Sequence, residues 1–216
     1  METLVYIMRH GESEGNARHS FLGHTDLPLT EKGRAQARAA RDYLARAGIV
    51  PDVAYASPLC RAYETAKIAL SYLPDLPIAL SEDVKEIYAG KWENLLVTEI
   101  DAAYPDDLAV WRADIGNSRP TGGETVRALA ERVRCEVLRL AALHEGKTVF
   151  IACHATPIRT FEALARGLGM DEAHLVPWPA NASLSAYLVE GERVTPLFYS
   201  LDSYLSAADD PTKIGL

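Results

Sequence analysis

Cysteine is scarce in this chain. Among 216 residues there are only Cys60, Cys135 and Cys153, and none belongs to a Cys-x-x-Cys pair. An odd number of cysteines without such a pair supports neither a disulfide framework nor a zinc site, so we expect no metal and no cofactor held by thiols. Unpaired cysteines are typical of proteins that work in a reducing compartment.

Positive charge and long apolar runs are also lacking. A formal net charge of -8 does not provide the broad basic face that binds a nucleic acid or an anionic membrane. No apolar stretch approaches the roughly 20 residues that span a bilayer. Strand-like residues follow Met1, where a signal peptide would have basic and apolar segments. We therefore expect a cytoplasmic protein without nucleic-acid or membrane partners, in which any bound anion is met by a few local cations.

The composition is otherwise that of an ordinary globular chain. With 48% hydrophobic and 24% charged residues it is long enough for one sizeable core, so we expect a single domain over residues 1–216. Apolar and β-branched runs predict strands at residues 3–8, 52–56, 148–153, 182–189 and 195–199. Helical periodicity predicts one helix from Thr30, its N-cap, to about residue 47 and another over residues 124–142. This alternation predicts a sheet covered by helices.

Residues 88–121 form the least regular part of the chain. Trp92, Tyr104 and Trp111 occur there together with several prolines and glycines. Such a segment is typical of a lid over a functional site, and equally of a packed irregular excursion. The sequence leaves both interpretations open.

The predicted strand at residues 3–8 ends in two side chains that do not suit a core. The stretch LVYIMRHGESEGN, residues 4–16, places Arg9 and His10 directly after the apolar run. In an open α/β sheet the ligand crevice lies at the carboxyl ends of the strands, where helix N-termini also present N–H groups to anions. We therefore expect this pair to stand at an anion site.

Two further junctions repeat this design. In YASPLCRAYETA, Ser57 is the predicted N-cap and Pro58 the first residue of a helix, with Arg61 in its first turn. In FIACHATPIR, His154 follows the strand and Thr156 is the predicted cap of a helix that a proline opens. Because helical side chains tilt back toward the N-terminus, the guanidinium of Arg61 can return over the strand end. The side chains of the three junctions are predicted to converge on one anion.

These motifs resemble those of the histidine phosphatase superfamily over essentially the whole chain. The family motifs have counterparts in RHGESEGN, GHTDLPLTEKGRAQA, SPLCRAYETA and CHATPIR. The resemblance implies an α/β fold of the phosphoglycerate mutase-like type. In that fold a mixed, mostly parallel central sheet lies between helical layers, in a three-layer α/β/α arrangement. It also implies a small-molecule phosphomonoester as the substrate.

The resemblance assigns roles to the site residues. His10 is implied to be the nucleophile. Arg9, Arg61 and His154 are implied to bind the phosphoryl group. Further substrate contacts are expected at Asn16, Gly23 and Ala155.

The chemistry of these side chains agrees with such roles. A neutral imidazole is a good nucleophile near pH 7, and a backbone carbonyl that holds one ring N–H would aim the other nitrogen at phosphorus, giving a phosphohistidine. Guanidiniums match phosphoryl oxygens bidentately and stay charged. A protonated His154 would add positive charge where the transition state spreads its negative charge. Because side chains already supply this charge, we expect an activity that needs no metal ion.

A leaving alkoxide needs a proton, and the resemblance implies its donor. The family has a glutamate four residues before a glycine and six before a tryptophan. In EIYAGKWEN this pattern corresponds to Glu86, with Gly90 and Trp92. The residues alone do not distinguish Glu86 from surface carboxylates such as Glu82 or Glu93, so its role as proton donor rests on the resemblance.

Departures from the family pattern favour a phosphatase. The mutases of the family carry an arginine directly after this glutamate, an Arg-Arg pair downstream, and a tryptophan before the asparagine of the first motif. Here Ile87 and Gly15 occupy the first and last of these positions, and the chain has no Arg-Arg dipeptide. Asn94 replaces a usual glycine. This change matters little if the position needs a left-handed backbone, because asparagine tolerates that conformation. The expected function is hydrolysis of a small phosphorylated metabolite through a phosphohistidine, with sugar phosphates, nucleotide phosphates and phosphoglycerate-like acids all open.

Other functions compete with this one. His-Gly-Glu also fits the His-x-Glu of zinc deaminases, but their Pro-Cys-x-x-Cys partner is absent. A phosphoglycerate mutase-type phosphotransferase stays open, as does a non-catalytic module that binds a phosphorylated ligand in the same pocket. His10 and Glu86 argue against the module, because binding alone needs neither. Nothing in the sequence indicates an oligomeric state.

Overall fold

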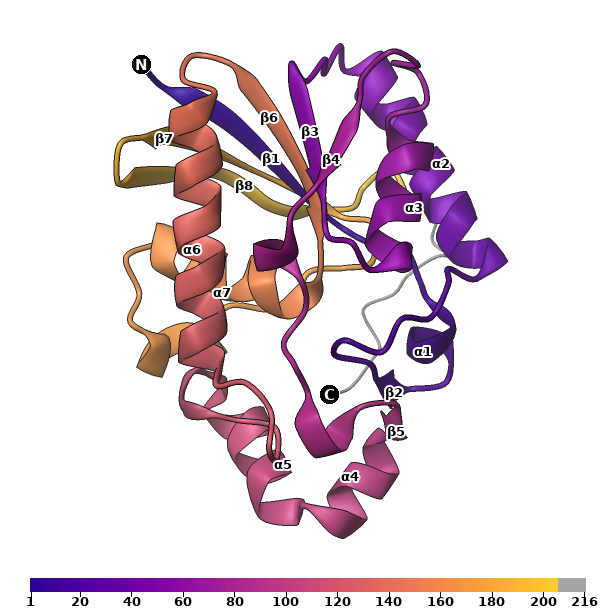
Figure 1. The fold of residues 1–216 in the computed structure, drawn as a ribbon, viewed down its shortest axis with the longest axis vertical. Helices are drawn as coiled ribbons and strands as arrows, with labels where there is room; N and C mark the ends of the chain where they lie inside the picture. The colour runs from indigo at the N-terminus through magenta and orange to yellow at the C-terminus, as the bar shows by residue number, and fades with distance from the viewer. Residues whose placement is uncertain (206–216) are drawn as a thin grey trace.

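A six-stranded sheet runs through the molecule in the order β4-β3-β6-β1-β7-β8, in a computed structural model that describes residues 1–205 (Figure 1). Its strands are β1 (Thr3–Arg9), β3 (Val53–Ala56), β4 (Ile78–Leu80), β6 (Thr148–Cys153), β7 (Leu184–Glu190) and β8 (Arg193–Leu201). The pairings β1–β6, β3–β6 and β3–β4 are parallel, whereas β1–β7 and β7–β8 are antiparallel. The expected mixed, mostly parallel sheet is confirmed. Residues 206–216, the end of the domain expected over 1–216, lie outside the described residues.

One strand of this sheet escaped the sequence analysis. β4 is three residues long, lies at the sheet edge, and has two exposed residues. It is therefore too short to stand out as an apolar or β-branched run of the kind by which the other strands were predicted. Those strands lie where they were expected, with ends shifted by a few residues.

Helices cover both faces of the sheet. The helices α2 (Glu31–Arg46) and α3 (Cys60–Ala69) pack on one face, and α6 (Val126–Leu143) and α7 (Ala155–Ala165) pack on the other (Figure 1). Alternate strand residues face the two layers. Val5 and Ile7 of β1 join the cluster with α6 and α7, whereas Met8 joins the cluster with α2 and α3. The expected three-layer α/β/α arrangement is confirmed.

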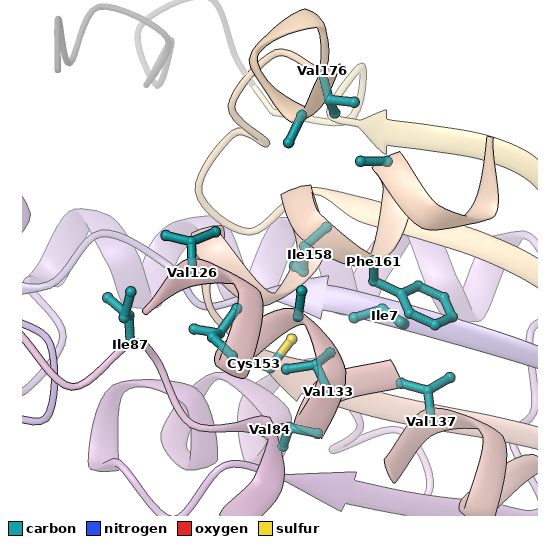
Figure 2. Packing of buried hydrophobic residues seen from close by; sticks show 14 of the residues in the cluster. Ile7, Val84, Ile87, Val126, Val133, Val137, Cys153, Ile158, Phe161 and Val176 are labelled. Carbon is teal, nitrogen blue, oxygen red and sulfur yellow. The ribbon is translucent and has the colours of Figure 1, made fainter. Parts of the chain in front are cut away.

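The apolar stripe of α6 is what anchors one layer to the sheet. Figure 2 shows Val133 and Val137 of this helix with Ile158 and Phe161 of α7 and Ile7 of β1, all in one buried cluster. Burying one such side chain contributes about 1.5–3 kcal/mol. This layer therefore holds β1, whose carboxyl end carries the junction residues, firmly in place.

The start of α2 follows its local capping signal. The Thr30 side chain accepts a hydrogen bond from the Gly33 N–H at 3.0 Å, as predicted for an N-cap. Thr125 caps α6 in the same way, with the Ala128 N–H at 3.2 Å, so this helix begins two residues later than predicted. No helix within residues 1–205 combines the length and the apolar composition needed to cross a membrane.

Two other predicted helix starts are wrong. α3 begins at Cys60 and not at Pro58, so Ser57 is not its cap. α7 begins directly after His154, so Thr156 is its second residue and not its cap. Proline is tolerated throughout the first turn of a helix, because the first N–H groups have no partner within the helix. A proline therefore locates a helix start only to within a few residues.

The segment 88–121 contains short regular elements. They are β5 (Leu95–Leu96), α4 (Val97–Ala103) and α5 (Pro105–Ala113). β5 pairs with β2 (Ser20–Phe21), which follows the short helix α1 (Glu14–Ala17). Figure 1 places α4 and α5 beyond one end of the sheet, outside the two helical layers. The interpretation of this segment as a lid stays a prediction.

Asn94 has the left-handed backbone that its place in the motif suggested. Its φ is 60°, in the region that asparagine tolerates better than most residues. The Asn94 N–H donates to the Phe21 carbonyl at 2.7 Å. The turn thus joins the excursion to β2.

Candidate active site

A cavity of about 430 Å³ opens at the carboxyl ends of the central strands. Arg9 ends β1 and His10 follows it, Arg61 is the second residue of α3, and His154 stands between β6 and α7. The ring centroids of His10 and His154 are 5.2 Å apart. The four residues meet because β1, β6 and β3 are adjacent parallel strands that end at one edge. The other predicted contacts also line the cavity: Asn16, Gly23, Glu86 and Ala155.

His10 is held in one ring orientation. Its Nδ1 lies 2.6 Å from the Gly11 carbonyl oxygen, which can only accept, so Nδ1 carries the proton and Nε2 keeps its lone pair. Burial, and then the charges of Arg61 and Arg9, lower the pKa of His10 well below its usual value. The imidazole is therefore neutral at pH 7, which is the nucleophilic form.

The two arginines are buried and only partly satisfied. Arg9 Nη1 donates to the Pro179 carbonyl at 2.6 Å. Arg61 donates from Nη1 to Thr25 and from Nη2 to Gly23, whose carbonyls lie at 2.9 and 2.8 Å. Burial lowers the pKa of Arg9 to about 10, so it stays charged at neutral pH. The Nε atoms of both arginines are buried without a partner among the described residues. Buried cationic donors of this kind suit an anion.

His154 lies behind His10 and is fully buried. Its Nε2 is 2.8 Å from Ser57 Oγ, and burial, followed by the charge of Arg61, lowers the pKa of His154 well below its usual value. The ring is thus neutral at pH 7, whereas the chemistry proposed from the sequence used its protonated form. A phosphoryl dianion beside it would oppose this shift. Ser57, which was predicted to cap α3, instead orients this imidazole.

Glu86 is the carboxylate that the structure places at the cavity. Its Oε2 accepts from the Thr156 N–H at 3.4 Å, at the N-terminus of α7, and its Oε1 accepts from the Ile87 N–H at 2.9 Å. The competing carboxylates lie elsewhere. Glu82 is 71% exposed and pairs with a lysine, whereas Glu93 accepts from the backbone N–H groups of residues 24 and 25. The tertiary structure therefore selects Glu86, which the residues alone could not do.

The backbone around Glu86 is clamped by Arg132 of α6, which the sequence analysis missed. Its guanidinium donates to the carbonyls of Asp83, Lys85 and Glu86 at 2.8, 2.9 and 3.0 Å. The Glu124 carboxylate pairs with the same guanidinium at 2.8 Å. Arg132 is 46 residues from Glu86 in the sequence, and its place in an amphipathic helix gave no sign of this contact.

Asn16 is fixed by a second asparagine that also escaped prediction. Asn16 Oδ1 accepts from the Ser13 N–H at 3.1 Å and from Asn181 Nδ2 at 3.3 Å. Asn181 Nδ2 also lies 3.1 Å from the His10 carbonyl. These bonds use the amide oxygen of Asn16, so its Nδ2 group is the one that a phosphoryl oxygen in the cavity would meet.

The side chains that could bind a metal ion do not cluster within residues 1–205. In the part of the chain that the structure describes, no group of three or more His, Cys, Asp or Glu side chains is placed to hold a metal ion. Cys60, Cys135 and Cys153 are all free thiols. Among the described residues, the charged and imidazole side chains that line the cavity are Arg9, His10, His19, Arg61 and Glu86.

Comparisons with known proteins agree with this geometry. The family model of the histidine phosphatase superfamily (branch 1) matches residues 5–201. The chain is 35% identical over 173 residues to a 2,3-bisphosphoglycerate-dependent phosphoglycerate mutase of Methylobacterium sp. (strain 4-46), covering 78% of this chain and 83% of the mutase. It is 30% identical over 202 residues to phosphoserine phosphatase 1 of Hydrogenobacter thermophilus, covering 93% of each.

Two solved structures have closely similar folds. Bacillus stearothermophilus YhfR superposes with a TM-score of 0.89 and 28% identity, over 94% of this chain and 100% of that one. A mycobacterial glucosyl-3-phosphoglycerate phosphatase, solved with VO3, gives a TM-score of 0.82 and 26% identity, over 92% and 98% of the two chains. Both mutases and phosphatases thus occur among the similar proteins.

Proposed function

The chain belongs to branch 1 of the histidine phosphatase superfamily, and from this premise we propose that it hydrolyses phosphate monoesters of small metabolites through a phosphohistidine on His10. One observation carries the proposal. The Nε2 lone pair of a neutral His10 stands in a cavity beside two buried guanidiniums whose Nε donors have no partner within residues 1–205. This combination provides a nucleophile and a phosphoryl site in one place.

The reaction has two steps. In the first, Arg9 and Arg61 hold the phosphoryl oxygens while His10 Nε2 attacks phosphorus; the bond to the alcohol oxygen breaks, and Glu86 gives that oxygen a proton. In the second, the Glu86 carboxylate takes a proton from a water molecule, whose oxygen attacks the phosphohistidine. Inorganic phosphate leaves and His10 returns to its neutral form. No step calls for a metal ion, because side chains supply the positive charge.

Two positions support hydrolysis over mutase activity. Ile87 is fully buried in the apolar cluster shown in Figure 2, so the position at which the mutases carry an arginine faces the core and not the cavity. At Gly15, an added Cβ would lie 2.3 Å from a methyl carbon of Leu22, so a larger residue there would require the Leu22 side chain to move. Both positions therefore support hydrolysis over a mutase-type recognition of a substrate carboxylate.

The phosphohistidine is the intermediate on which the proposal depends. Mixing the protein with a phosphate monoester labelled in the phosphoryl group, and quenching in alkali within one turnover, is expected to trap an acid-labile label on His10. EDTA in the mixture should leave its yield unchanged. The His10→Ala variant should carry no label, and label persisting in that variant would identify another nucleophile. A non-catalytic binding module would give no covalent label at all.

Hydrolysis is expected to exceed isomerisation. With 3-phosphoglycerate and a catalytic amount of 2,3-bisphosphoglycerate, phosphate release and formation of 2-phosphoglycerate can be followed in one tube by phosphorus NMR. Buried Ile87 stands where the mutases carry an arginine after the glutamate, and Gly15 stands where they carry a tryptophan. Phosphate should therefore accumulate faster than the isomer. An isomerisation rate equal to or above the rate of phosphate release would reverse the assignment in favour of a mutase.

A further inference from the structure

The cavity extends well beyond the cationic groups. Its volume of about 430 Å³ is more than a phosphoryl group fills, and lies in the range of about 300–1,000 Å³ that is typical of pockets for whole small molecules. Besides the phosphoryl-binding groups, the lining includes an apolar wall made of the side chains of Phe21, Val97, Trp111, Pro177 and Trp178. This wall faces whatever alcohol the phosphoryl group is attached to.

The aromatic part of this wall is fixed by packing. The rings of Trp111 and Trp178 are stacked, with centroids 6.0 Å apart and planes inclined by 22°. Phe21 meets Trp111 edge to face at 5.1 Å and 76°. Trp111 is 2% exposed, so its ring has little freedom to move. The wall is therefore a preformed aromatic surface.

Trp178 is supported from outside the cavity by Arg159 of α7. The guanidinium carbon of Arg159 lies 4.3 Å from the centroid of the Trp178 ring. Arg159 Nε donates to the Val176 carbonyl at 2.6 Å, and its Nη2 donates to the His174 carbonyl at 3.1 Å. Arg159 thus holds the segment that carries Trp178 and does not itself line the cavity.

Positive charge is confined to the phosphoryl end. Of the lysines and arginines within residues 1–205, Arg9 and Arg61 are those that line the cavity. The other polar side chains in the lining are His10, Asn16, His19, Ser20 and Thr156, together with the Glu86 carboxylate. A second anionic group on a substrate would lose its hydration against apolar walls, without an arginine or lysine to pair with.

We propose that this outer part of the cavity is a leaving-group subsite for an uncharged aromatic alcohol. The preferred substrates are then aryl phosphate monoesters whose only anionic group is the phosphoryl group. Esters that carry a carboxylate, such as phosphoserine or phosphoglycerate, are disfavoured. This proposal rests on the hydrolysis proposed above. The physical basis is burial of the aromatic ring against the stacked tryptophans, worth about 25 cal/mol per Å² of apolar surface.

A set of three esters with leaving groups of similar acidity tests the subsite in the natural protein. They are 2-naphthyl phosphate, phenyl phosphate and 3-carboxyphenyl phosphate. The ratio kcat/KM is expected to rise roughly tenfold from phenyl to naphthyl, and to fall roughly tenfold from phenyl to carboxyphenyl, the size of effect that one apolar contact gives in a pocket. Equal values for the three esters, or a preference for the carboxyphenyl ester, would overturn the proposal.

Two variants report on the wall separately. Trp178→Ala should remove most of the preference for naphthyl over phenyl. Val97→Lys adds an ammonium group to the apolar wall. It should raise kcat/KM for the carboxyphenyl ester relative to kcat/KM for the phenyl ester, and mere destabilisation of the protein would not change this ratio in that direction. Val110→Ala is the matched control, because Val110 precedes Trp111 on α5, is 42% exposed and does not line the cavity. It should leave both ratios unchanged. If Trp178→Ala and Val97→Lys keep the kcat/KM ratios of the natural protein, the discrimination between the esters does not arise at this wall.

Binding to His10→Ala separates this proposal from the proposed function. Calorimetric titration of this variant with the three esters needs no turnover, and should give the tightest binding for the naphthyl ester and the weakest for the carboxyphenyl ester. If the natural protein hydrolyses none of the esters but this order of binding holds, the proposed function fails and the subsite stands. If the esters are hydrolysed but bind and react alike, the subsite fails and the proposed function stands.

Discussion

Replacing His10 with alanine is expected to lower kcat by about 10⁶-fold, the scale on which loss of a covalent nucleophile acts. The reason is geometric as well as chemical. The Gly11 carbonyl holds His10 Nδ1 at 2.6 Å, so Nε2 is the free nitrogen, and burial keeps the ring neutral at pH 7. His154 cannot take over, because its Nε2 is engaged by Ser57 and it lies behind the cavity. Turnover of p-nitrophenyl phosphate measures the loss.

Binding should survive this substitution. Arg9 and Arg61 keep their backbone partners in His10→Ala, so the dissociation constant for inorganic phosphate should change by less than about tenfold, because each cationic contact is retained. His174→Ala is the matched control, because His174 is exposed, its ring bonds to the Asp171 carbonyl, and the His174 carbonyl that Arg159 contacts is kept in the variant. Its kcat should match that of the natural protein. A His10→Ala protein that turns over within tenfold of the natural rate would exclude His10 as the nucleophile.

Glu86→Gln is expected to separate the two steps of the reaction by leaving group. An alkyl phosphate needs a proton on its departing oxygen, so phosphoryl transfer from such an ester should fall roughly 10²- to 10⁴-fold, the usual range for general acid catalysis. A p-nitrophenyl ester barely needs that proton. With it, the variant should transfer the phosphoryl group to His10 at nearly the natural rate and then stall, because no carboxylate activates the water. Rapid mixing should show a burst of nitrophenol followed by slow turnover.

The control for this experiment is Glu82→Gln. Glu82 stands four residues earlier, is 71% exposed, and pairs with Lys85 at 2.7 Å on the surface. Its variant should give natural rates with both esters and no burst. Equal losses for alkyl and nitrophenyl esters in single-turnover experiments with Glu86→Gln would remove Glu86 from the acid role, and Asp83 and Glu93 would then be tested.

The strand ends show how far local pattern reaches. The apolar run before Arg9 stops where the cavity begins, and the run before His154 stops just before Ala155 and Thr156, which line the cavity. A buried strand needs a continuous apolar run, so the point at which polar side chains interrupt it is legible from residues next to one another. Their convergence was also predictable, because parallel strands that are neighbours end at one edge.

The helix starts show where local pattern fails. The threonine cap of α2 was found correctly, since its signal is a single side chain and an N–H three residues on. The serine before α3 carries the same signal, yet its hydroxyl lies against His154, which is 97 residues away in the sequence. The side chain of a predicted capping residue can instead bond to a residue far away in the sequence, and the neighbouring residues in the sequence do not indicate this.

By itself the sequence determined the main strands and helices and the junctions that carry Arg9, His10, Arg61 and His154, because apolar periodicity acts over a few residues. Only the tertiary structure decided which carboxylate lies at the cavity, because Glu86 is placed by Arg132 on a distant helix. It also decided that both imidazoles are neutral, because burial and neighbouring cations set their pKa values. The aromatic wall has the same origin. Trp111 and Trp178 lie far apart in the sequence, and only packing through space stacks their rings.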